Sequence, residues 1–367
     1  MTSSALYIGI MSGTSLDGID VVLTDFGQPF PALLSSLLVP YPQHIRSALA
    51  AISQPGDNEI EQLGLLEADL ADCYAGAVTQ LLQQSGYAAT QIQAIGCHGQ
   101  TIRHRPNGRQ PFSYQIGDMH RLAASTGIRV IADFRRKDIA FGGQGAPLVP
   151  AFHQAIFADS QRGRCILNIG GIANITLLVP HQAVQGFDTG PGNCLLDNWI
   201  EQQQGLPYDA NGAFAASGQL QPELLVKLLS DNYFQQTGPK STGREYFQLA
   251  WLQQHLTGSH YRAADVQRTL SQFSAGTMAL AISRYPVQDV FVCGGGAFNP
   301  QLLADLQSLL PQCRISTTAE LGVAPDWVEA MAFGWLAYAF DLRIPGNVPA
   351  VTGARQPLVL GLEFLPY

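Results

Sequence analysis

Apolar positions along the chain follow two periods, which predict strands and helices in turn. Consecutive or alternating apolar residues predict strands at 6–10, 19–26, 35–39, 93–97, 129–132, 164–169, 173–179, 184–187 and 289–293. Apolar residues three to four positions apart predict helices at 59–84, 118–125, 194–204, 221–229, 263–284, 299–310 and 326–340. Strands interspersed with helices in this way indicate an α/β fold.

The order of these elements occurs twice. A strand, a polar turn, two more strands and then helices begin at Leu6 and again at Arg164. The turn between the first two strands is Ser12–Gly18 in one copy and Gly170–Gly171 in the other. Two such halves that face one another would place backbone amides on opposite sides of one cleft, which suits a triphosphate and its metal ion. The Gly/Pro-rich stretch 141–150 is the expected crossing point between the halves.

Length, composition and charge narrow the class of protein. The chain has 367 residues, more than one hydrophobic core usually organises, so we expect two domains. Hydrophobic residues make up 46% and charged residues 13%, a balance that favours folded cores over disorder. The formal net charge of −8 and the lack of a basic stripe in the sequence argue against a nucleic-acid partner.

The cysteines and the apolar runs bear on the compartment. The six cysteines are scattered, without a Cys-x-x-Cys pair or a zinc-like spacing, so we expect free thiols in a reducing environment. The sequence shows no N-terminal signal core, and no apolar run approaches the roughly 20 residues of a membrane span. We therefore expect a cytoplasmic protein without a membrane partner.

The first polar turn is the clearest candidate for a phosphate site. Its glycines let backbone N–H groups approach phosphate oxygens, and its hydroxyl groups add further donors. Asp17 and Asp20 offer the oxygen ligands that Mg²⁺ prefers. An ordinary hairpin turn is the alternative, because Gly, Ser and Asp are common in turns. The candidate nucleotide-binding residues are Gly13, Thr14, Ser15, Leu16, Asp17, Gly18, Ile19 and Asp20.

Two more glycine-rich turns follow predicted strands. Gly170 and Gly171 repeat the strand–glycine–strand arrangement, with a tight hairpin as the alternative. Gly294, Gly295 and Gly296 separate a strand from a helix, where a flat ligand or its sugar can lie against the backbone. This run lacks the full G-x-G-x-x-G dinucleotide pattern, so it does not predict a nucleotide site by itself.

Asp188 is the candidate general base. We expect it at the end of an apolar strand and before a rigid Gly/Pro turn, where a carboxylate beside a cleft can accept a proton. The alternative is that Asp188 caps the helix that begins near Cys194, although Gly192 or Asn193 is better placed to do so.

Polar residues near other strand ends are candidates for the substrate side. His98 is expected in a turn after the strand at 93–97, at a surface or cleft, and Gln100 follows it closely. Arg135 lies in a basic run that can neutralise an anionic substrate or phosphate. A structural histidine and a solvated charge run are the alternatives.

These motifs closely resemble those of the 1,6-anhydro-N-acetylmuramic acid kinase family, and the resemblance spans essentially the whole chain. The segments that carry it are IGIMSGTSLDGID (8–20), GCHGQT (96–101), DFRR (133–136), GGQGAPLVPAFH (142–153), LNIGG (167–171), FDTGPGN (187–193), PKSTGRE (239–245), CGGG (293–296), EAMAF (329–333) and VTGA (351–354). Each motif is common by itself, whereas the combination is highly specific.

The resemblance implies a fold and a reaction. The fold would be the two-domain actin-like ATPase fold with a central inter-domain cleft, with domain I at 1–133 plus about 345–367 and domain II at 134–344. ATP, with Mg²⁺, would phosphorylate O6 of 1,6-anhydro-N-acetylmuramic acid while water opens the anhydro bridge at C1. The products would be N-acetylmuramic acid 6-phosphate and ADP, in peptidoglycan recycling. The family also implies a homodimer.

The resemblance implies residue roles as well. Asp188 would be the base that activates the water. Residues 13–20 and Gly170–Gly171 would hold the phosphates and Mg²⁺, with Asp17 and Asp20 as metal ligands, and Gly294–Gly296 would lie near the adenosine. The substrate-side candidates are His98, Gln100, Arg135 and Glu329. Arg135 would meet the lactyl carboxylate of the sugar, while the alternative for Glu329 is to cap or pack its own helix.

Two other functions compete with this one. Another hexose or N-acetylhexosamine kinase of the same superfold would share the phosphate turns. A non-catalytic actin-like ATPase module would bind nucleotide and carry a peptide-binding appendage, whereas only a short tail follows Phe340 in this sequence.

Overall fold

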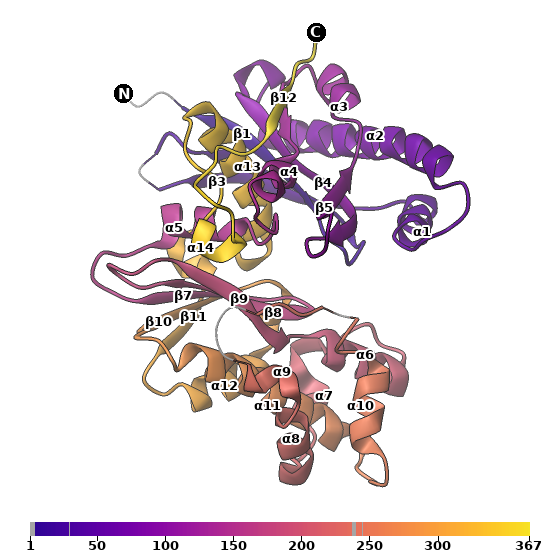
Figure 1. Cartoon of the computed structure of the whole chain (residues 1–367), viewed down its shortest axis with the longest axis vertical. Coiled ribbons are helices and arrows are strands. Elements are labelled where there is room, and N and C mark those ends of the chain that lie inside the picture. Colours follow the sequence, from indigo (N-terminus) through magenta and orange to yellow (C-terminus); the bar gives the residue numbers. More distant parts are fainter. Residues whose placement is uncertain (1–3, 29, 237–239, 244) are drawn as a thin grey trace. The chain divides into compact units, whose positions relative to one another are not determined.

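The chain forms two compact units, each built around one β-sheet (Figure 1). The structure is a computed structural model that describes residues 4–28, 30–236, 240–243 and 245–367. The first unit is Met1–Ile156 with Trp327–Tyr367, and the second is Phe157–Asp326.

The first unit holds a seven-stranded sheet in the order β12-β6-β4-β1-β2-β3, with β5 paired to β4. β1 is antiparallel to β2 and parallel to β4. The strands are β1 (Leu6–Ser12), β2 (Gly18–Asp25), β3 (Ala32–Pro40), β4 (Ala94–Arg105), β5 (Phe112–Ile116), β6 (Val130–Ala132) and β12 (Leu362–Phe364). The helices are α1 (Gln43–Ile52), α2 (Glu59–Ser85), η1 (Ala89–Gln91), α3 (Met119–Thr126), α4 (Phe134–Ala140), α5 (Val149–Phe157), α13 (Val328–Asp341) and α14 (Pro349–Thr352).

The second unit holds a five-stranded sheet in the order β11-β10-β7-β8-β9. Its strands are β7 (Arg164–Ile169), β8 (Ile172–Leu178), β9 (Gln185–Pro191), β10 (Asp289–Cys293) and β11 (Arg314–Thr317). Its helices are α6 (Cys194–Gln204), η2 (Ala210–Gly212), α7 (Ala213–Ala216), α8 (Pro222–Leu229), α9 (Asn232–Gln235), α10 (Leu249–Leu256), α11 (Ala263–Ile282), η3 (Gly295–Phe298), α12 (Pro300–Leu309) and η4 (Thr318–Leu321). The short η5 (Pro325–Trp327) ends where the chain returns to the first unit.

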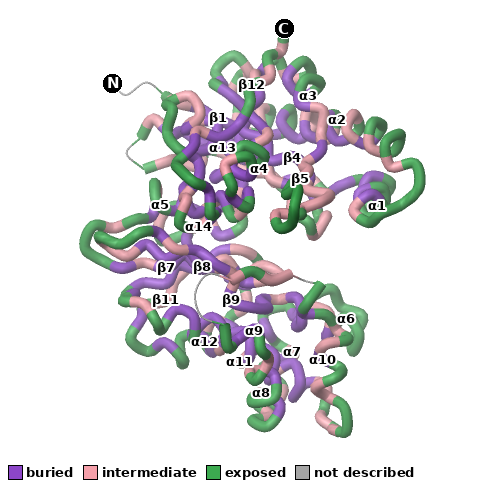
Figure 2. The backbone as a smooth tube through the Cα atoms, viewed as in Figure 1, coloured by how far each residue is buried: buried purple, intermediate pink, exposed green. Residues whose placement is uncertain are grey.

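The internal repeat expected from the sequence is present in both sheets. Three consecutive antiparallel strands, β1-β2-β3 and β7-β8-β9, begin each unit. A later strand then pairs in parallel with the first strand of each set, β4 with β1 and β10 with β7. The buried strands of both sheets appear purple in Figure 2, with exposed positions on the outer helices.

Glycines in two neighbouring strands bring α13 against the sheet of the first unit. A Cβ at Gly9 of β1 would lie 1.9 Å from the Ala330 carbonyl oxygen, and one at Gly96 of β4 would lie 1.9 Å from the Phe333 carbonyl oxygen. Since side chains alternate along a strand, Ile8 and Ile10 point to the other face and join the core that includes α2. The sheet is therefore packed on both faces.

The unit boundaries differ from the domain boundaries inferred at 133/134 and near 344/345. The compact units divide at 156/157 and 326/327, which places α4, most of α5 and all of α13 in the first unit. The glycine-mediated packing of α13 on β1 and β4 accounts for its place there. The assignment of actin-like domains I and II stays a prediction.

Most predicted elements are confirmed, but two strands are longer than expected. β4 continues through His98 to Arg105, so the turn expected at His98–Gly99 is wrong; Gly99 instead has φ +75° where the register with β1 shifts. β9 continues to Pro191, so Asp188 lies inside a strand rather than at its end. In both cases pairing with a neighbouring strand extends the element through polar and glycine residues that an apolar pattern does not reveal.

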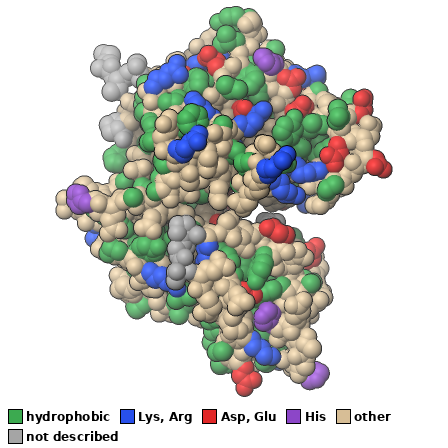
Figure 3. All heavy atoms as spheres, in the orientation of Figure 1, with side chains coloured by type: hydrophobic (Ala, Val, Ile, Leu, Met, Phe, Trp, Pro, Cys, Tyr) green, Lys and Arg blue, Asp and Glu red, His purple; other side chains and the backbone are tan. Residues whose placement is uncertain are grey.

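The cysteines are free, as expected from their spacing, and charged side chains of both signs lie on the surface (Figure 3). All six cysteines are free. Acidic and basic side chains are interspersed on the face drawn in Figure 3. Among the described residues, no helix has the length and apolar character that crossing a membrane would demand.

Candidate functional site

The turn between β1 and β2 presents polar groups while one apolar side chain anchors it. Leu16 adopts φ +59°, its N–H donates to the Gly13 carbonyl at 3.2 Å, and its side chain packs against the core of the first unit. Left-handed backbone is uncommon for leucine and persists only where the surroundings impose it. Thr14 and Asp17 are exposed beside it. The turn is therefore held in place by Leu16, and its Thr14 and Asp17 residues are exposed.

Gln100 supports this turn from below. It is fully buried, its Nε2 donates to the Gly13 carbonyl at 3.1 Å, and its Oε1 accepts from the Tyr41 hydroxyl at 3.3 Å. Ser12 Oγ, next to the turn, lies 3.0 Å from the Tyr74 hydroxyl. Both ends of the Gln100 amide thus bond to the protein itself. Neither tyrosine contact was predictable from the sequence, because Tyr41 lies far from Gln100 and Tyr74 far from Ser12 along the chain.

The last residues of the turn segment, Gly18 to Asp20, are buried or half-buried. Gly18 is required by close packing, because a Cβ there would lie 2.5 Å from the Val39 carbonyl oxygen. Ile19 is buried in the core. Asp20 is half-buried within β2, opposite Met11 of β1.

Asp17 and Asp20 suit one mode of magnesium binding. Among the described residues there is no group of three or more His, Cys, Asp or Glu that could hold a metal ion. Mg²⁺ in nucleotide enzymes is usually held by one or two carboxylates together with substrate phosphates, rather than by a cage of protein ligands. Asp17, which is exposed, and Asp20, which is half-buried, lie on the same hairpin and offer carboxylate oxygens for that mode.

His98 and Arg135 form a hydrogen-bonded pair in the first unit. Arg135 Nε and Nη2 lie 3.1 and 2.9 Å from His98 Nε2, and Arg135 Nη1 donates to the Gly145 carbonyl at 2.6 Å. A guanidinium group can only donate, so Nε2 is the acceptor and the ring proton lies on Nδ1. Burial, and then the Arg135 charge, hold the pKa of His98 well below its usual value. The imidazole is therefore neutral.

The surroundings of this pair differ in part from expectation. His98 is 5% exposed and packs against the Phe333 ring, with centroids 4.6 Å apart, so the expected surface position is wrong. Burial lowers the pKa of Arg135 to about 10, against the opposing effect of the Glu329 and Asp138 charges. Glu329 lies in the first turn of α13, half-buried. The structure thus brings His98, Arg135 and Glu329 together, whereas Gln100 bonds to the turn between β1 and β2.

Asp138 orients the loop that receives Arg135. Its buried carboxylate accepts from Gly145 N at 2.8 Å, Asn347 Nδ2 at 2.7 Å and Thr352 Oγ1 at 2.8 Å. The Gly145 carbonyl in turn accepts from Arg135. Sequence reasoning singled out none of these contacts. The only indication in the sequence was that residues 142–153 and 351–354 belong to the segments that resemble the kinase family.

Two glycine-rich turns of the second unit, Gly170–Gly171 and Gly294–Gly296, meet at one end of its sheet. β7 and β10 are parallel, so Asn168 and Cys293 lie side by side and the turns that follow them are neighbours. A Cβ at Gly294 would lie 2.4 Å from Asn168 Oδ1, and one at Gly296 would lie 2.3 Å from Ile169 Cγ2. Side chains are thus excluded where Gly294–Gly296 crosses the end of β7.

The Gly170–Gly171 turn bonds to the start of α6. The Gly170 carbonyl accepts from Asn193 N at 2.9 Å, and the Gly171 carbonyl accepts from Gly192 N at 2.9 Å. A Cβ at Gly192 would lie 2.3 Å from the Gly170 oxygen, so this contact needs glycine. Gly170, Gly171 and Gly294 are half-buried and Gly295 is exposed. The arrangement offers a flat stretch of backbone that a nucleotide can approach.

Asp188 is half-buried in β9, the edge strand of the second sheet. Its Oδ2 accepts from Ser241 Oγ at 3.2 Å and from Thr242 N at 3.0 Å. Burial raises the pKa of Asp188, against the lowering effect of these two hydrogen bonds. It does not cap α6, whose N-cap residue is Asn193. Of the predicted PKSTGRE segment, Pro239 and Arg244 lie outside the described residues.

Comparison with known proteins decides the family. The family model described as "Anhydro-N-acetylmuramic acid kinase" matches residues 5–366. The chain belongs to the anhydro-N-acetylmuramic acid kinase family. It is 52% identical over 365 residues to the anhydro-N-acetylmuramic acid kinase of Shewanella amazonensis, covering 99% of each chain. It is also 52% identical over 368 residues to that of Saccharophagus degradans, again over 99% of each.

Membership in this family confirms two of the expectations from the sequence. The enzyme class is an ATP-dependent sugar kinase. The fold is the two-domain α/β fold of actin-like ATPases. In structure the chain resembles component A of the (R)-2-hydroxyglutaryl-CoA dehydratase of Acidaminococcus fermentans. That similarity has a TM-score of 0.50 and 12% sequence identity, and it covers 90% of this chain and 96% of the other.

Proposed function

We propose that this member of the family couples two events, transfer of the ATP γ-phosphoryl group to O6 of 1,6-anhydro-N-acetylmuramic acid and hydrolytic opening of the 1,6-anhydro ring. The family and the relatives that share half of its residues support the kinase activity and the sugar. The Asp188 carboxylate carries the hydrolytic part, because it is held in place in β9 and burial raises its pKa.

The chemistry requires a base, because O6 of the substrate is part of the anhydro bridge and has no hydroxyl proton. A water oxygen bonds to C1 as the C1–O6 bond breaks, and O6 bonds to the γ-phosphorus as ADP leaves. The water must lose a proton, which we assign to Asp188. A carboxylate whose pKa is raised toward the working pH accepts a proton more effectively than an ordinary aspartate does.

Nucleotide binding is assigned to the glycine turns and the first hairpin. In the second unit, Gly170–Gly171 would meet phosphates and Gly294–Gly296 would meet the adenosine. In the first unit, the polar groups of 13–20 would bind phosphates, and Asp17 and Asp20 would hold Mg²⁺. The ion, when bound, neutralises charge that develops on the phosphate oxygens. Two observations support this assignment: Gln100 holds the turn by a hydrogen bond to Gly13, and glycines leave the backbone of the second unit without side chains at these turns.

We propose that Arg135 binds the lactyl carboxylate of the substrate. Its Nε, Nη1 and Nη2 each make a bond within the protein, which fixes the plane of the guanidinium group. The remaining N–H groups are then available to a carboxylate, which pairs well with this planar donor. His98 sets the orientation of Arg135, and the charge of Glu329 opposes its loss of a proton. This explains why a neutral, buried histidine lies at the site.

Product analysis in ¹⁸O-labelled water tests the proposal. Purified protein is incubated with ATP, Mg²⁺ and the anhydro sugar, and the product is analysed by mass spectrometry and NMR. We expect label on C1 and phosphate on O6. Phosphorylation that leaves the ring closed, or that occurs only with sugars bearing a free hydroxyl, would favour another hexose or N-acetylhexosamine kinase. Nucleotide binding without sugar turnover would favour a non-catalytic ATPase module.

We also propose that the protein acts in the cytoplasm as a homodimer and serves peptidoglycan recycling. The family resemblance supports these assignments. Analytical ultracentrifugation of the purified chain tests the dimer, and a monomer at working concentrations contradicts it.

A further inference from the structure

Both hydrogen bonds to the Asp188 carboxylate, among the described residues, reach the same oxygen. Ser241 Oγ and Thr242 N lie 3.2 and 3.0 Å from Oδ2. Oδ1 is thereby left to accept a proton from a ligand. A carboxylate that is held through one oxygen cannot exchange its two oxygens by rotation without breaking these bonds.

The segment Lys240–Thr242 covers the free edge of β9 beside Asp188. β9 is the edge strand of its sheet, and the Asp188 N–H donates to the Lys240 carbonyl at 3.0 Å. An edge N–H without a strand partner needs another acceptor, which Lys240 provides. The same segment therefore holds both the backbone and the side chain of Asp188.

Lys240 ties this segment to the aromatic core below it. Its Nζ donates to the Tyr233 carbonyl at 2.9 Å and lies 4.1 Å from the centre of the Tyr233 ring. The Tyr233 hydroxyl in turn donates to the Asp188 carbonyl at 2.8 Å. Tyr233 and its neighbour Phe234 belong to a buried cluster with Phe247, so the anchor is rigid.

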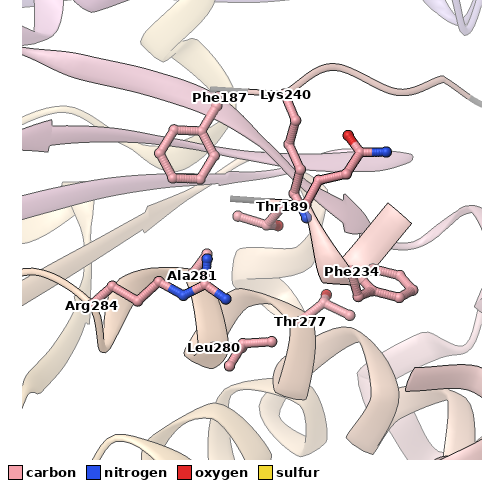
Figure 4. Close-up of a pocket in the computed structure, with 9 residues that line it drawn as sticks. Phe187, Thr189, Phe234, Lys240, Thr277, Leu280, Ala281 and Arg284 are labelled. Atoms are coloured by element: carbon pink, nitrogen blue, oxygen red, sulfur yellow. The ribbon is translucent and has the colours of Figure 1, made fainter. Parts of the chain in front are cut away.

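The Lys240 side chain lines a small pocket behind β9, on the face opposite Asp188. Phe187 and Thr189, which flank Asp188 in the strand, line the same pocket, and Arg284 enters it from the end of α11 (Figure 4). Burial and the Arg284 charge lower the pKa of Lys240. Lys240 thus stays in the pocket through its contacts with Tyr233, although a second cation lies nearby.

We propose that Ser241 and Thr242, held in place by Lys240, are positioning residues for Asp188, which fix its Oδ2 and keep the carboxylate ionised while Oδ1 receives the proton of the attacking water. This inference rests on the proposed role of Asp188 as the base. Among the residues that the structure describes, the groups that face Asp188 are the Tyr233 phenol, the Ser241 hydroxyl and the Thr242 N–H, with the neutral Asn174 opposite it in β8.

The charge balance explains why both hydrogen bonds matter. Burial by itself favours the protonated carboxyl, which cannot accept a proton. Hydrogen bonds to the ionised form oppose that effect, so they preserve the base at working pH. Removing the Ser241 hydroxyl should therefore raise the pKa of Asp188 and shift the acidic limb of the rate profile upward.

The test compares Ser241→Ala with Ser241→Thr, which keeps a hydroxyl group, and with Ser230→Ala, which removes an exposed hydroxyl that bonds only to the Lys227 carbonyl. One measurement is the pH dependence of kcat/KM for the anhydro sugar. The other is a ¹³C NMR titration of aspartate carboxyls in the ligand-free protein, with Asp188 assigned by its absence from Asp188→Asn.

For Ser241→Ala we expect two values to rise by about half a pH unit: the pKa of Asp188 in the NMR titration and the acidic pKa of the kcat/KM profile. The reason is that one hydrogen bond to a partly exposed carboxylate is lost. Ser241→Thr and Ser230→Ala should follow the wild type. If the Asp188 carboxyl of Ser241→Ala titrates as in the wild type, the positioning role is overturned. If the carboxyl shifts and the rate profile does not, the contact is upheld and the assignment of Asp188 as the base fails instead.

Lys240→Met tests the anchor separately. It keeps the length of the side chain but removes the hydrogen bond to Tyr233, so we expect kcat to fall several-fold while KM for ATP changes little. Arg284→Gln is the control for charge, because Arg284 lines the same pocket from the region that follows α11. Equal losses of kcat in both variants would overturn the anchoring role.

Discussion

Replacing Gln100 tests whether the first turn depends on the amide that supports it. Gln100 Nε2 donates to the Gly13 carbonyl at 3.1 Å, and Oε1 accepts from Tyr41 at 3.3 Å, in a fully buried setting. In Gln100→Ala both bonds are lost. One net hydrogen bond contributes about 1 to 1.5 kcal/mol, so nucleotide affinity should fall by about tenfold if the turn binds phosphates.

Gln100→Glu makes the same test dependent on pH. A buried carboxyl of this kind is neutral at low pH and can then donate to the Gly13 carbonyl as the amide does. Burial raises its pKa in the folded protein above the unfolded value, so support of the turn is present at low pH. It is lost as the pH rises through the raised pKa, because the ionised carboxylate faces a carbonyl oxygen.

The assay is the affinity for a fluorescent ATP analogue between pH 6 and 9, with thermal unfolding measured alongside. We expect Gln100→Glu to bind nearly as the wild type at pH 6 and to weaken at high pH, while Gln100→Ala is weak throughout. Gln93→Glu, at an exposed position, is the control. Wild-type affinity in Gln100→Ala across the range would refute the link between Gln100, the turn and the nucleotide.

Three further predictions concern the base, the sheet and the substrate side. Asp188→Asn should abolish turnover and leave ATP binding intact by calorimetry; near-normal turnover would remove Asp188 from the base role. Gly96→Ala should lower the melting temperature markedly, because its Cβ would lie 1.9 Å from a carbonyl oxygen of α13, whereas Gly76→Ala, which meets open space, should not. Arg135→Met should raise KM for the sugar at least about tenfold and move the pKa of His98 back upward by NMR titration, since the Arg135 charge lowers it.

The sequence predicted features that depend on local pattern. Apolar runs located β1, β7 and β10, and the spacing of apolar residues located α2 and α6. The repeat of strand, turn and strands was visible because it recurs in order along the chain. Asp188 and the glycine turns were singled out for the same reason, since they follow apolar runs.

Features that depend on distant partners were not predictable from pattern. Tyr74 bonds to Ser12 and Tyr41 bonds to Gln100 from distant parts of the chain, and nothing near either tyrosine in sequence indicates this. The extension of β4 past His98 depends on pairing with β5. His98 was expected to be accessible because it follows a strand, yet Phe333 of α13, more than half the chain away, buries it. Tertiary contacts decided these positions.

The placement of α13 has a consequence for the order in which the protein forms during synthesis. The second unit is one continuous stretch, so the ribosome can release all of it before the chain ends. The first unit begins before the second in the sequence but receives α13 and β12 only after the second unit has been made. Until then, Gly9 and Gly96 leave one face of its sheet without the backbone that they are shaped to receive. The unit that is begun first is therefore completed after the other, and a nascent chain that stops before Trp327 carries an open sheet face on which chaperones or aggregation can act.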